Sequence, residues 1–310
     1  MQVRFLGFSF STESTTLGLD DYIDHIVRNH GETHELGEHN RILFFNTTHS
    51  KNYYVGLLVT VKDQKTFCQL VKKSGHLVVK VNELDDDSNL MDFNFFVLHK
   101  TTGFGIYQYY HQSCSVNSFG YFNNRRFAEY RDSRVDAEIS AIPRNERTES
   151  KKKAVKKKYK SKLSWEILVR KEKLKDLIEE FQRVKAFEYC FLALTADEPE
   201  FKPLKTYVRK ERTKLSFDSK SPVKSLADAI SKIVNKHGID DGKVIGTDLD
   251  GIERILRITD NPDNFGEYAY DDVAPKINSL DVAQFEKSWV VQELLEKCEE
   301  YKHIFEAKAK

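Results

Sequence analysis

The chain has 310 residues, of which 40% are hydrophobic and 31% are charged, and its formal net charge at pH 7 is only +1. This composition is typical of one large folded domain or two, and it excludes a chain that is disordered throughout or polycationic along its whole length. The longest apolar runs, such as Tyr53–Val61, are too short to span a bilayer, and the opening MQVRFLGFSF lacks a secretory signal pattern. Four widely spaced cysteines indicate reduced thiols, so we expect a cytoplasmic protein.

Residues 1–120 predict a strand-rich N-terminal domain. Val3–Phe10 has the composition of a strand, and several later segments are rich in β-branched and aromatic residues and are separated by turn-like clusters. These further predicted strands are Arg41–Thr47, Tyr53–Val61, Leu77–Val81, Phe93–His99 and Gly105–Tyr110. We therefore expect a curved antiparallel sheet with few helices.

Two helices are predicted within this domain. Apolar residues recur at helical spacing from Leu19 to Val27, and Gly31 is a plausible stop signal. Gln64–Lys73 predicts a second, shorter helix between two of the strands. Its inward-facing residues would be Phe67, Leu70 and Val71.

Residues 121–163 predict a basic hinge or linker between two domains. The stretch from Phe119 to Arg144 loses clear periodicity, and the run KKKAVKKKYKSK at Lys151–Lys162 places eight lysines among twelve residues. A local concentration of cations favours binding to a phosphate backbone, because neutralising phosphates releases condensed counterions. The alternative is a solvated, flexible linker that keeps the chain soluble.

Residues 164–310 predict an α+β domain whose elements follow the split βαβ, or ferredoxin-like, order. The predicted elements are strand Ser164–Val169, helix Lys171–Arg183, strand Phe187–Leu194, strand Lys205–Phe217, a helix from Ser221 to Gly238, and strands Lys243–Gly246 and Glu253–Thr259. A long amphipathic helix is predicted over Val282–Phe305, where it would pack on its own sheet or on a second copy of the chain. Its candidate buried positions are Phe285, Trp289, Leu294, Leu295, Cys298 and Phe305. The predicted fold class is α+β, with an N-terminal antiparallel-sheet domain, a C-terminal ferredoxin-like domain and a long C-terminal helix.

Most catalytic signatures are missing from the sequence, including GxGxxG, GxxxxGK[ST], HExxH and GxSxG. Asp248, Asp250 and Glu253 could hold a divalent ion in a metal-dependent nuclease, with Lys243 stabilising developing charge. The simpler interpretation is a hairpin turn at Asp250-Gly251 with Asp248 in water. We therefore expect a binding or sensor protein, and we assign no catalytic residue, metal or cofactor.

A loose group of histidines near the N-terminus could suggest a metal site. It consists of His25, His30, His34 and His39. Gly31 and Gly37 interrupt the spacing, so the group does not keep to one helix face. Solvent-facing or partly buried histidines are the better account of this pattern.

Three basic groups favour a surface for nucleic acid: the lysine run, the arginines that precede it, and the predicted strand Lys205–Lys214, which carries cations on both sides. A charged edge strand that resists aggregation is the alternative for the last group. No helix-turn-helix, zinc-finger or RNP pattern is present, so contacts to phosphate and no sequence preference are expected. The predicted DNA contacts are Lys151, Lys152, Lys153, Lys156, Lys157, Lys158, Lys160, Arg125, Arg126, Arg209, Lys210, Arg212 and Lys214.

The succession of segments resembles the RexA-like phage exclusion proteins of lambdoid phages. The segments are GLDDYIDHIVRNHG, HNRILFFNT, YYVGLLVTVKD and DFNFFVLHKTTGFGIYQYY, followed by FEYCFLAL, TYVRKERTKL, VKSLADAISKIV and GTDLDGIERILRI. The resemblance implies a dimeric, two-domain DNA binder that senses infecting phage and signals to a membrane-channel partner, which leads to abortive infection. It implies no catalytic residues. The lysine-rich insertion at 146–163 departs from the family, so the DNA contacts are taken from this sequence alone.

The leading hypothesis is a cytoplasmic homodimer that binds double-stranded DNA through backbone contacts and acts as a sensor in phage exclusion. A hinge at residues 120–163 would let two lobes close on the duplex. A metal-dependent nuclease of a phage-defence system is the alternative. A third possibility is a scaffold whose basic tract meets an acidic protein or the inner membrane surface.

Overall fold

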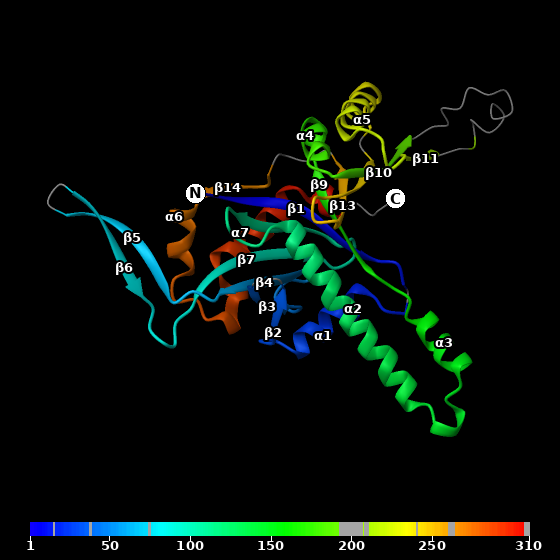
Figure 1. Cartoon of the computed structure of the whole chain (residues 1–310), viewed down its shortest axis with the longest axis horizontal. Helices are drawn as coiled ribbons and strands as arrows, with labels where there is room; N and C mark the ends of the chain where they lie inside the picture. Colours follow the sequence, from blue (N-terminus) through cyan, green and yellow to red (C-terminus); the bar gives the residue numbers. More distant parts are fainter. Residues whose placement is uncertain are drawn as a thin grey trace.

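The computed structural model describes residues 1–14, 16–36, 39–73, 76–191, 207, 211–239, 241–259 and 264–306. Within these residues the fold is mixed α+β, with a large, mostly antiparallel sheet and several helices packed against it (Figure 1). This confirms the predicted α+β class. The sheet has twelve strands, and a separate two-stranded hairpin projects beside it.

Strand β1 (Gln2–Thr12) lies in the middle of the large sheet and joins its two halves. It pairs antiparallel with β8 on one side, and with β9 (Leu163–Val169) and the short β14 (Glu267–Ala269) on the other. From β1 outward, the N-terminal strands are β8 (Phe104–Tyr110), β7 (Leu90–His99), β4 (Tyr53–Lys62), β3 (His39–Asn46) and β2 (Thr33–Leu36). All but β2 were predicted from the sequence, and those predictions are confirmed.

Helices cover both faces of the N-terminal strands. On one face α1 (Leu19–Arg28) and α2 (Val116–Ala141) pack in a core that contains Phe119. On the other face α7 (Trp289–Glu300) packs in a core that contains Leu294. Because successive side chains of a strand point to opposite faces, strands covered on both faces carry nearly continuous apolar runs, as β4 does.

The predicted C-terminal helix over Val282–Phe305 is broken into three pieces. These are a 3-10 helix, η5 (Val282–Lys287), then α7, then a short α8 (Lys302–Phe305). Ser288 has an extended backbone between η5 and α7, and its Oγ accepts a hydrogen bond from the Val291 N–H as the N-cap of α7. Of the two predicted arrangements, packing on the chain's own sheet is the one observed. Of the six side chains expected to be buried, Phe285, Leu294, Cys298 and Phe305 are buried, whereas Trp289 and Leu295 are half-buried.

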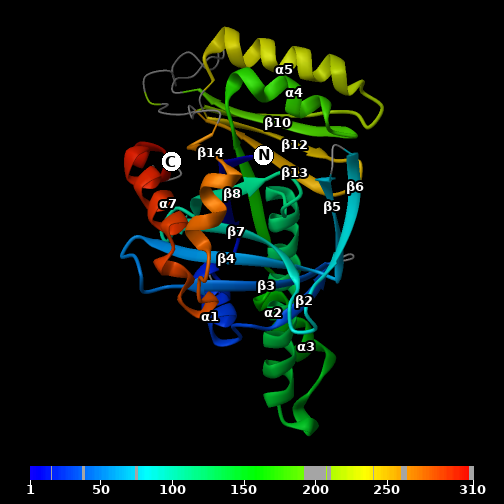
Figure 2. The same ribbon diagram turned by 90° about the vertical axis from the view of Figure 1, so that its left-hand side faces the viewer.

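The C-terminal half extends the same sheet beyond β9. Its elements in chain order are β9, α4 (Leu174–Glu179), β10 (Arg183–Phe191), β11 (Glu211–Ser216), α5 (Val223–His237), β12 (Gly242–Thr247) and β13 (Glu253–Ile258). Helices α4 and α5 pack together over these strands at the end of the molecule opposite α3 (Glu149–Lys158) (Figure 2). The β-α-β-β-α-β chain order therefore appears as predicted, followed by one more strand.

The predicted ferredoxin-like strand order is wrong. In a split βαβ unit, one strand separates the two parallel strands that the first helix connects. Here two strands, β12 and β13, lie between β9 and β10, and β13 runs parallel to β9. The reason is the tight turn at Asp250-Gly251, where Gly251 has a φ of +78°, because it makes β12 and β13 a hairpin that enters the sheet as a pair.

The helix predicted over Gln64–Lys73 is also wrong. Most of these residues form β5 (Thr66–Lys73), whose one partner among the described strands is β6 (His76–Glu83), in the two-stranded hairpin on the left of Figure 1. Leu70, predicted to face inward, is 67% exposed. Each residue of β5 has a ladder partner in β6, which carries the β-branched residues Val78, Val79 and Val81. Among the described residues, no other strand pairs with β5.

The predicted hinge at residues 121–163 is mostly helical. The long helix α2 spans its first half, the 3-10 helix η1 (Arg144–Glu146) follows, and α3 contains most of the lysine run. The large sheet runs across the predicted division, since β1 pairs with β9. The division into residues 1–120, 121–163 and 164–310 stays a prediction.

Short elements complete the chain. They are η2 (Lys171–Lys173), α6 (Tyr270–Val273) and η4 (Ala274–Ile277). Among the residues that the structure describes, no helix combines the length and the apolar character needed to cross a bilayer.

Candidate nucleic-acid interface

Helix α2 positions the basic segment. It begins at the N-cap Ser115, whose Oγ accepts a hydrogen bond from the Ser118 N–H, and it ends two residues before Pro143. The first part of α2 lies on the sheet with Phe119, Phe122 and Phe127 buried, and its C-terminal end projects away from the sheet (Figure 1). We call residues 131–162, which comprise the end of α2, the connection, α3 and the residues before β9, the helical arm.

The lysine-rich helix α3 is held against α2 by a small core and a polar lock. Val155 and Tyr159 are buried in the same cluster as Val135 of α2. The Tyr159 hydroxyl donates to Glu138 of α2 at 2.7 Å, and Lys158 donates to the same carboxylate at 2.6 Å. These two bonds hold the pKa of the Glu138 carboxyl below its usual range. Most of the lysine run therefore lies in a helix that packs on α2. This arrangement differs from the flexible linker that was the alternative prediction.

Charge is distributed unevenly between the arm and the rest of the chain. The arm contains 12 lysines and arginines and 5 acidic residues, whereas the remaining residues contain 37 and 43. A chain with a formal net charge of +1 therefore carries a strongly basic arm on an acidic body. Such a separation orients a protein toward a polyanion at long range and keeps the body away from it.

The lysines of α3, together with Lys160 just after its end, fall into two groups. Three of them form ion pairs within the arm: Lys151 with Glu146, Lys152 with Glu149 and Lys158 with Glu138, at 2.6–2.7 Å. Four others form no ion pair with any residue that the structure describes: Lys153, Lys156, Lys157 and Lys160.

Three of the unpaired lysines share one face of α3. Lys153, Lys156 and Lys157 have i, i+3 and i+4 spacing, and all three are exposed on the side away from the buried Val155. Like charges at this spacing destabilise a helix by roughly 0.2–0.5 kcal/mol per pair. The stability of α3 therefore does not explain why three lysines share this face, whereas binding of an anionic partner does explain it.

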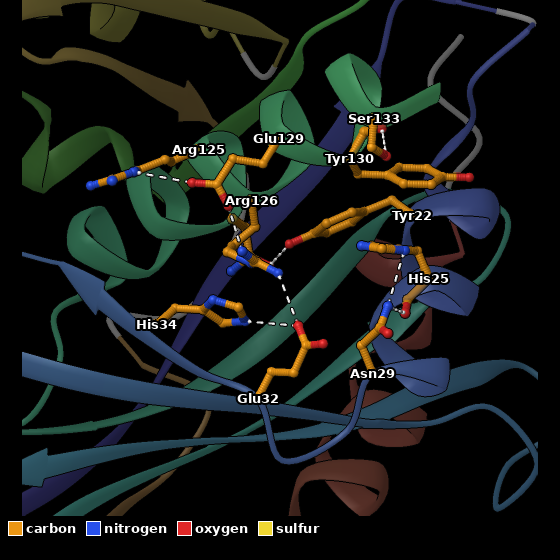
Figure 3. Close-up of polar contacts among 11 residues, drawn as sticks. Tyr22, His25, Asn29, Glu32, His34, Arg125, Arg126, Glu129, Tyr130 and Ser133 are labelled. Carbon is orange, nitrogen blue, oxygen red and sulfur yellow. Dashed lines mark hydrogen bonds and ion pairs between the residues drawn. The ribbon is translucent and has the colours of Figure 1, made fainter. Parts of the chain in front are cut away.

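The arginines at the root of the arm are occupied by acids (Figure 3). Arg125 pairs with Glu129 at 3.3 Å, one turn further along α2. The side chain of Arg126 is only 11% exposed and lies between Glu129 and Glu32, which is 3.8 Å away. Both arginines were predicted as DNA contacts; the structure places them in a network that joins α2 to the residues after α1.

The N-terminal histidines have three separate roles. His25 stacks on Tyr130 with ring centroids 4.4 Å apart, and His34 lies 3.6 Å from Glu32, as Figure 3 shows. The Nε2 atom of His30 accepts a hydrogen bond from the Phe45 N–H. Across the described parts of the chain, no group of three or more His, Cys, Asp or Glu side chains could hold a metal ion.

Because of these histidines, we expect the free energy of unfolding to fall on acidification. Burial lowers the pKa of the His30 imidazole below its ordinary value of 6.5, and protonation of Nε2 would break its bond to Phe45. The unfolded chain thus takes up this proton first, so the free energy of unfolding should be constant above about pH 6.5 and fall as the pH drops below it. Urea unfolding at pH 7.5 and 5.5 should show this fall, and His30→Gln should reduce it. The exposed His111 provides the control, because His111→Gln should keep the wild-type pH dependence; an unreduced slope in His30→Gln would contradict the assignment.

The third predicted basic group lies far from the arm. Strand β11 pairs with β10 and forms the opposite edge of the sheet from β2, at the end of the molecule away from α3 (Figure 1). Lys214 pairs with Glu188 at 2.8 Å, and a hydrogen bond with Cys190 raises the pKa of Arg212. Arg209 and Lys210 lie outside the described residues. The structure therefore brings the predicted contacts of α3 together, and it does not bring Arg212 and Lys214 to them.

The carboxylates weighed as a nuclease site have structural contacts. Oδ1 of Asp248 accepts hydrogen bonds from the N–H groups of Asp250 and Ile252 and so shapes the β12–β13 turn. Burial acts to raise the pKa of Glu253, and Lys185 and Lys162, at 3.0 and 3.5 Å, outweigh it and hold that pKa below its usual range. Lys243, predicted as their cationic partner, pairs with Glu188.

One cation in the core escaped the sequence-based predictions. Arg41 stands in the segment RILFFNT, where Arg41, Leu43 and Phe45 are the buried residues of β3. The sequence contained a signal for this burial. Alternate residues of a strand face the same side, so Arg41 lies on the same side of β3 as Leu43 and Phe45.

Comparison with known proteins gives no match: no family model matches the chain, and no curated protein matches it significantly in sequence. The resemblance to RexA-like proteins stays a prediction. The function is therefore argued from the charges and contacts of the arm.

Proposed function

We propose that the chain binds double-stranded DNA through the helical arm, without a preference for base sequence. The observation that carries the proposal is the exposed face of α3, where Lys153, Lys156 and Lys157 have no acidic partner among the described residues. A polyanion supplies the missing charge and gains counterion entropy when it does so. The acidic balance of the remaining chain restricts such binding to the arm.

The spacing of the lysines suits a phosphate backbone. Lys153 and Lys157 are one helical turn apart, about 6 Å along the axis of α3. Phosphates of one DNA strand rise by about 3.4 Å per nucleotide, so each lysine can reach a different phosphate. Contacts of this kind fix position on a duplex and carry no sequence information, which agrees with the missing recognition motifs.

The proposed contact is a projecting arm and replaces the two closing lobes of the sequence-based hypothesis. The arm is packed on α2, and α2 is packed on the sheet, so DNA can meet the lysine face without a hinge movement. A sensor role in phage exclusion, with a membrane-channel partner, extends the proposal and is supported by the resemblance of the segments quoted above. Homodimerisation belongs to the same proposal, and the exposed apolar side chains of the β5–β6 hairpin, such as Leu77 and Val79, support it.

The proposal is tested by fluorescence anisotropy with three unrelated labelled duplexes between 50 and 200 mM salt, chosen as roughly the range over which backbone contacts are lost. The three dissociation constants should agree within a few fold, and the plot of log K against log salt should have a slope of about −3 for three to four phosphate contacts. Absence of binding at the lowest salt, or a strong preference for one sequence, would overturn the proposal. So would flotation of the protein on anionic vesicles in the presence of excess duplex, because that result would identify a membrane surface as the partner.

A further inference from the structure

A groove lies between the start of α2, strand β3 and the β12–β13 turn, on a different part of the molecule from the lysine face. It has two adjoining parts of about 760 and 600 Å³, and both are lined by Ser115, Asn117 and Arg254. Volumes of this size are ordinary for sites that bind small molecules. The start of α2 therefore lies where the two parts meet.

The N-terminus of α2 presents free donors to this groove. The Ser115 cap satisfies the Ser118 N–H, and in the bonds of the described residues the N–H groups of Val116 and Asn117 have no acceptor. The first turn of this 26-residue helix contains no acidic side chain that would offset its dipole. A long helix concentrates about half a positive charge at such an end, which favours an anion there.

Arg41 provides an independent reason to expect an anion. Its side chain lines the same groove as Ser115 and Asn117, although the residue is only 6% exposed. Its Nε and Nη1 atoms are buried and have no hydrogen-bond partner in the described structure. The guanidinium lies close enough to Cys114, the residue before the cap, to act against the rise that burial causes in the pKa of that thiol. An unpaired buried guanidinium is costly, so an arginine in this position calls for an external counter-charge.

Most of the other charged groups of the groove have partners. Arg254 lies 3.6 Å from Glu180, and Arg4 lies 3.8 Å from Glu267. Asp248 is held by the N–H groups of its own turn. Arg41 thus differs from Arg4 and Arg254 in lacking an acid among the described residues.

We propose that this groove binds a phosphoryl group, as a phosphate monoester, between the Arg41 guanidinium and the free N–H groups at the start of α2. A planar guanidinium and two amide donors match the several acceptor oxygens of a phosphate. The carrier is either a mononucleotide or the phosphorylated 5′ end of a nucleic-acid strand. The site does not depend on the lysines of α3, so it can be present whether or not the arm binds DNA.

The test uses the full-length protein with inorganic phosphate and AMP as probes, against sodium chloride of equal ionic strength. Both probes should raise the melting temperature of the wild type. Arg41→Met should melt higher than the wild type without a probe, because the variant no longer buries an unpaired charge, and should bind AMP at least about tenfold more weakly by calorimetry. Arg28→Met, a change at an exposed arginine of α1, is the control and should bind AMP like the wild type.

A second variant separates binding from folding. Asn117→Asp places a carboxylate in the first turn of α2, where it stabilises the helix and repels an anion, so the protein should stay folded and lose the response to phosphate. A 5′-phosphorylated oligonucleotide that competes with AMP better than its 5′-hydroxyl counterpart identifies a strand end as the carrier, and equal weak competition by both identifies a mononucleotide. The proposal is overturned if neither probe shifts the wild type, or if Arg41→Met and Asn117→Asp bind AMP as the wild type does.

Discussion

Replacing Lys153, Lys156 and Lys157 together by alanine is expected to weaken duplex binding by roughly two orders of magnitude in 0.1 M salt, and to reduce the salt slope of log K by about 2.7. Each lysine lost removes one phosphate contact and the counterion release that accompanies it. Alanine is the best helix former, so α3 should remain helical, and removing three like charges from one face favours the helix further. Anisotropy titrations over the same salt range measure both quantities, and circular dichroism checks that the helix is kept.

A matched variant of the same helix separates unpaired lysines from net charge. Replacing Lys151, Lys152 and Lys158 by alanine also removes three positive charges, but each of these lysines already has an acidic partner within 2.7 Å. That triple variant should lose less than about tenfold in affinity, because the paired lysines have less charge to offer to phosphate. Equal losses in the two variants would show that only total charge matters, and unchanged affinity in the first would remove α3 from the interface.

The strands of the N-terminal half could be predicted because their pattern is local. β4 and β7 are covered by helices on both faces, so their apolar runs identify them wherever they lie in the sheet. The order of strands could not be predicted in the same way. The β12–β13 hairpin lies between β10 and β9 because the edges of those two strands meet it in space. No feature of the chain from Gly242 to Ile258 identifies β10 and β9 as its neighbours. β5 was misassigned because Phe67, Leu70 and Val71 fit a helical stripe as well as a strand.

The candidate site was also predictable only in its local features. The lysine run is visible in the sequence, and Glu146 and Glu149 are near enough along the chain to suggest partners. The partner of Lys158 is Glu138, which lies on α2 and reaches Lys158 only because the two helices pack. The burial of Arg126 likewise depends on Glu32, which comes from the other end of the N-terminal half.

Helix α2 links the two proposed sites. Its 26 residues make a rod of about 39 Å that starts in the groove beside Arg41 and ends in the arm. Every position along a helix is fixed once one turn is anchored, so the packing of the first two turns sets the place of the phosphate donors and the direction of the arm. Phe119 is the central side chain of that anchor.

Phe119→Ala should therefore lower the free energy of unfolding by about 3–5 kcal/mol, as large-to-small changes at fully buried aromatic residues do. The Phe119 ring is fully buried, and its centroid lies 4.7–5.6 Å from the rings of four side chains of the sheet: Phe8, Phe10, Phe96 and Tyr107. Aromatic pairs at such distances each add about 0.5–1.5 kcal/mol beyond the area that they bury.

Urea unfolding at pH 7.5 measures this loss, and Tyr121→Ala provides the control from the same helix. Tyr121 is 37% exposed, so its replacement should change the free energy of unfolding by less than about 1 kcal/mol. Both variants introduce alanine into α2, which makes any difference in helix propensity small. Similar losses in the two variants would mean that α2 is not anchored through Phe119, and that both the direction of the arm and the place of the groove's donors are set by other contacts.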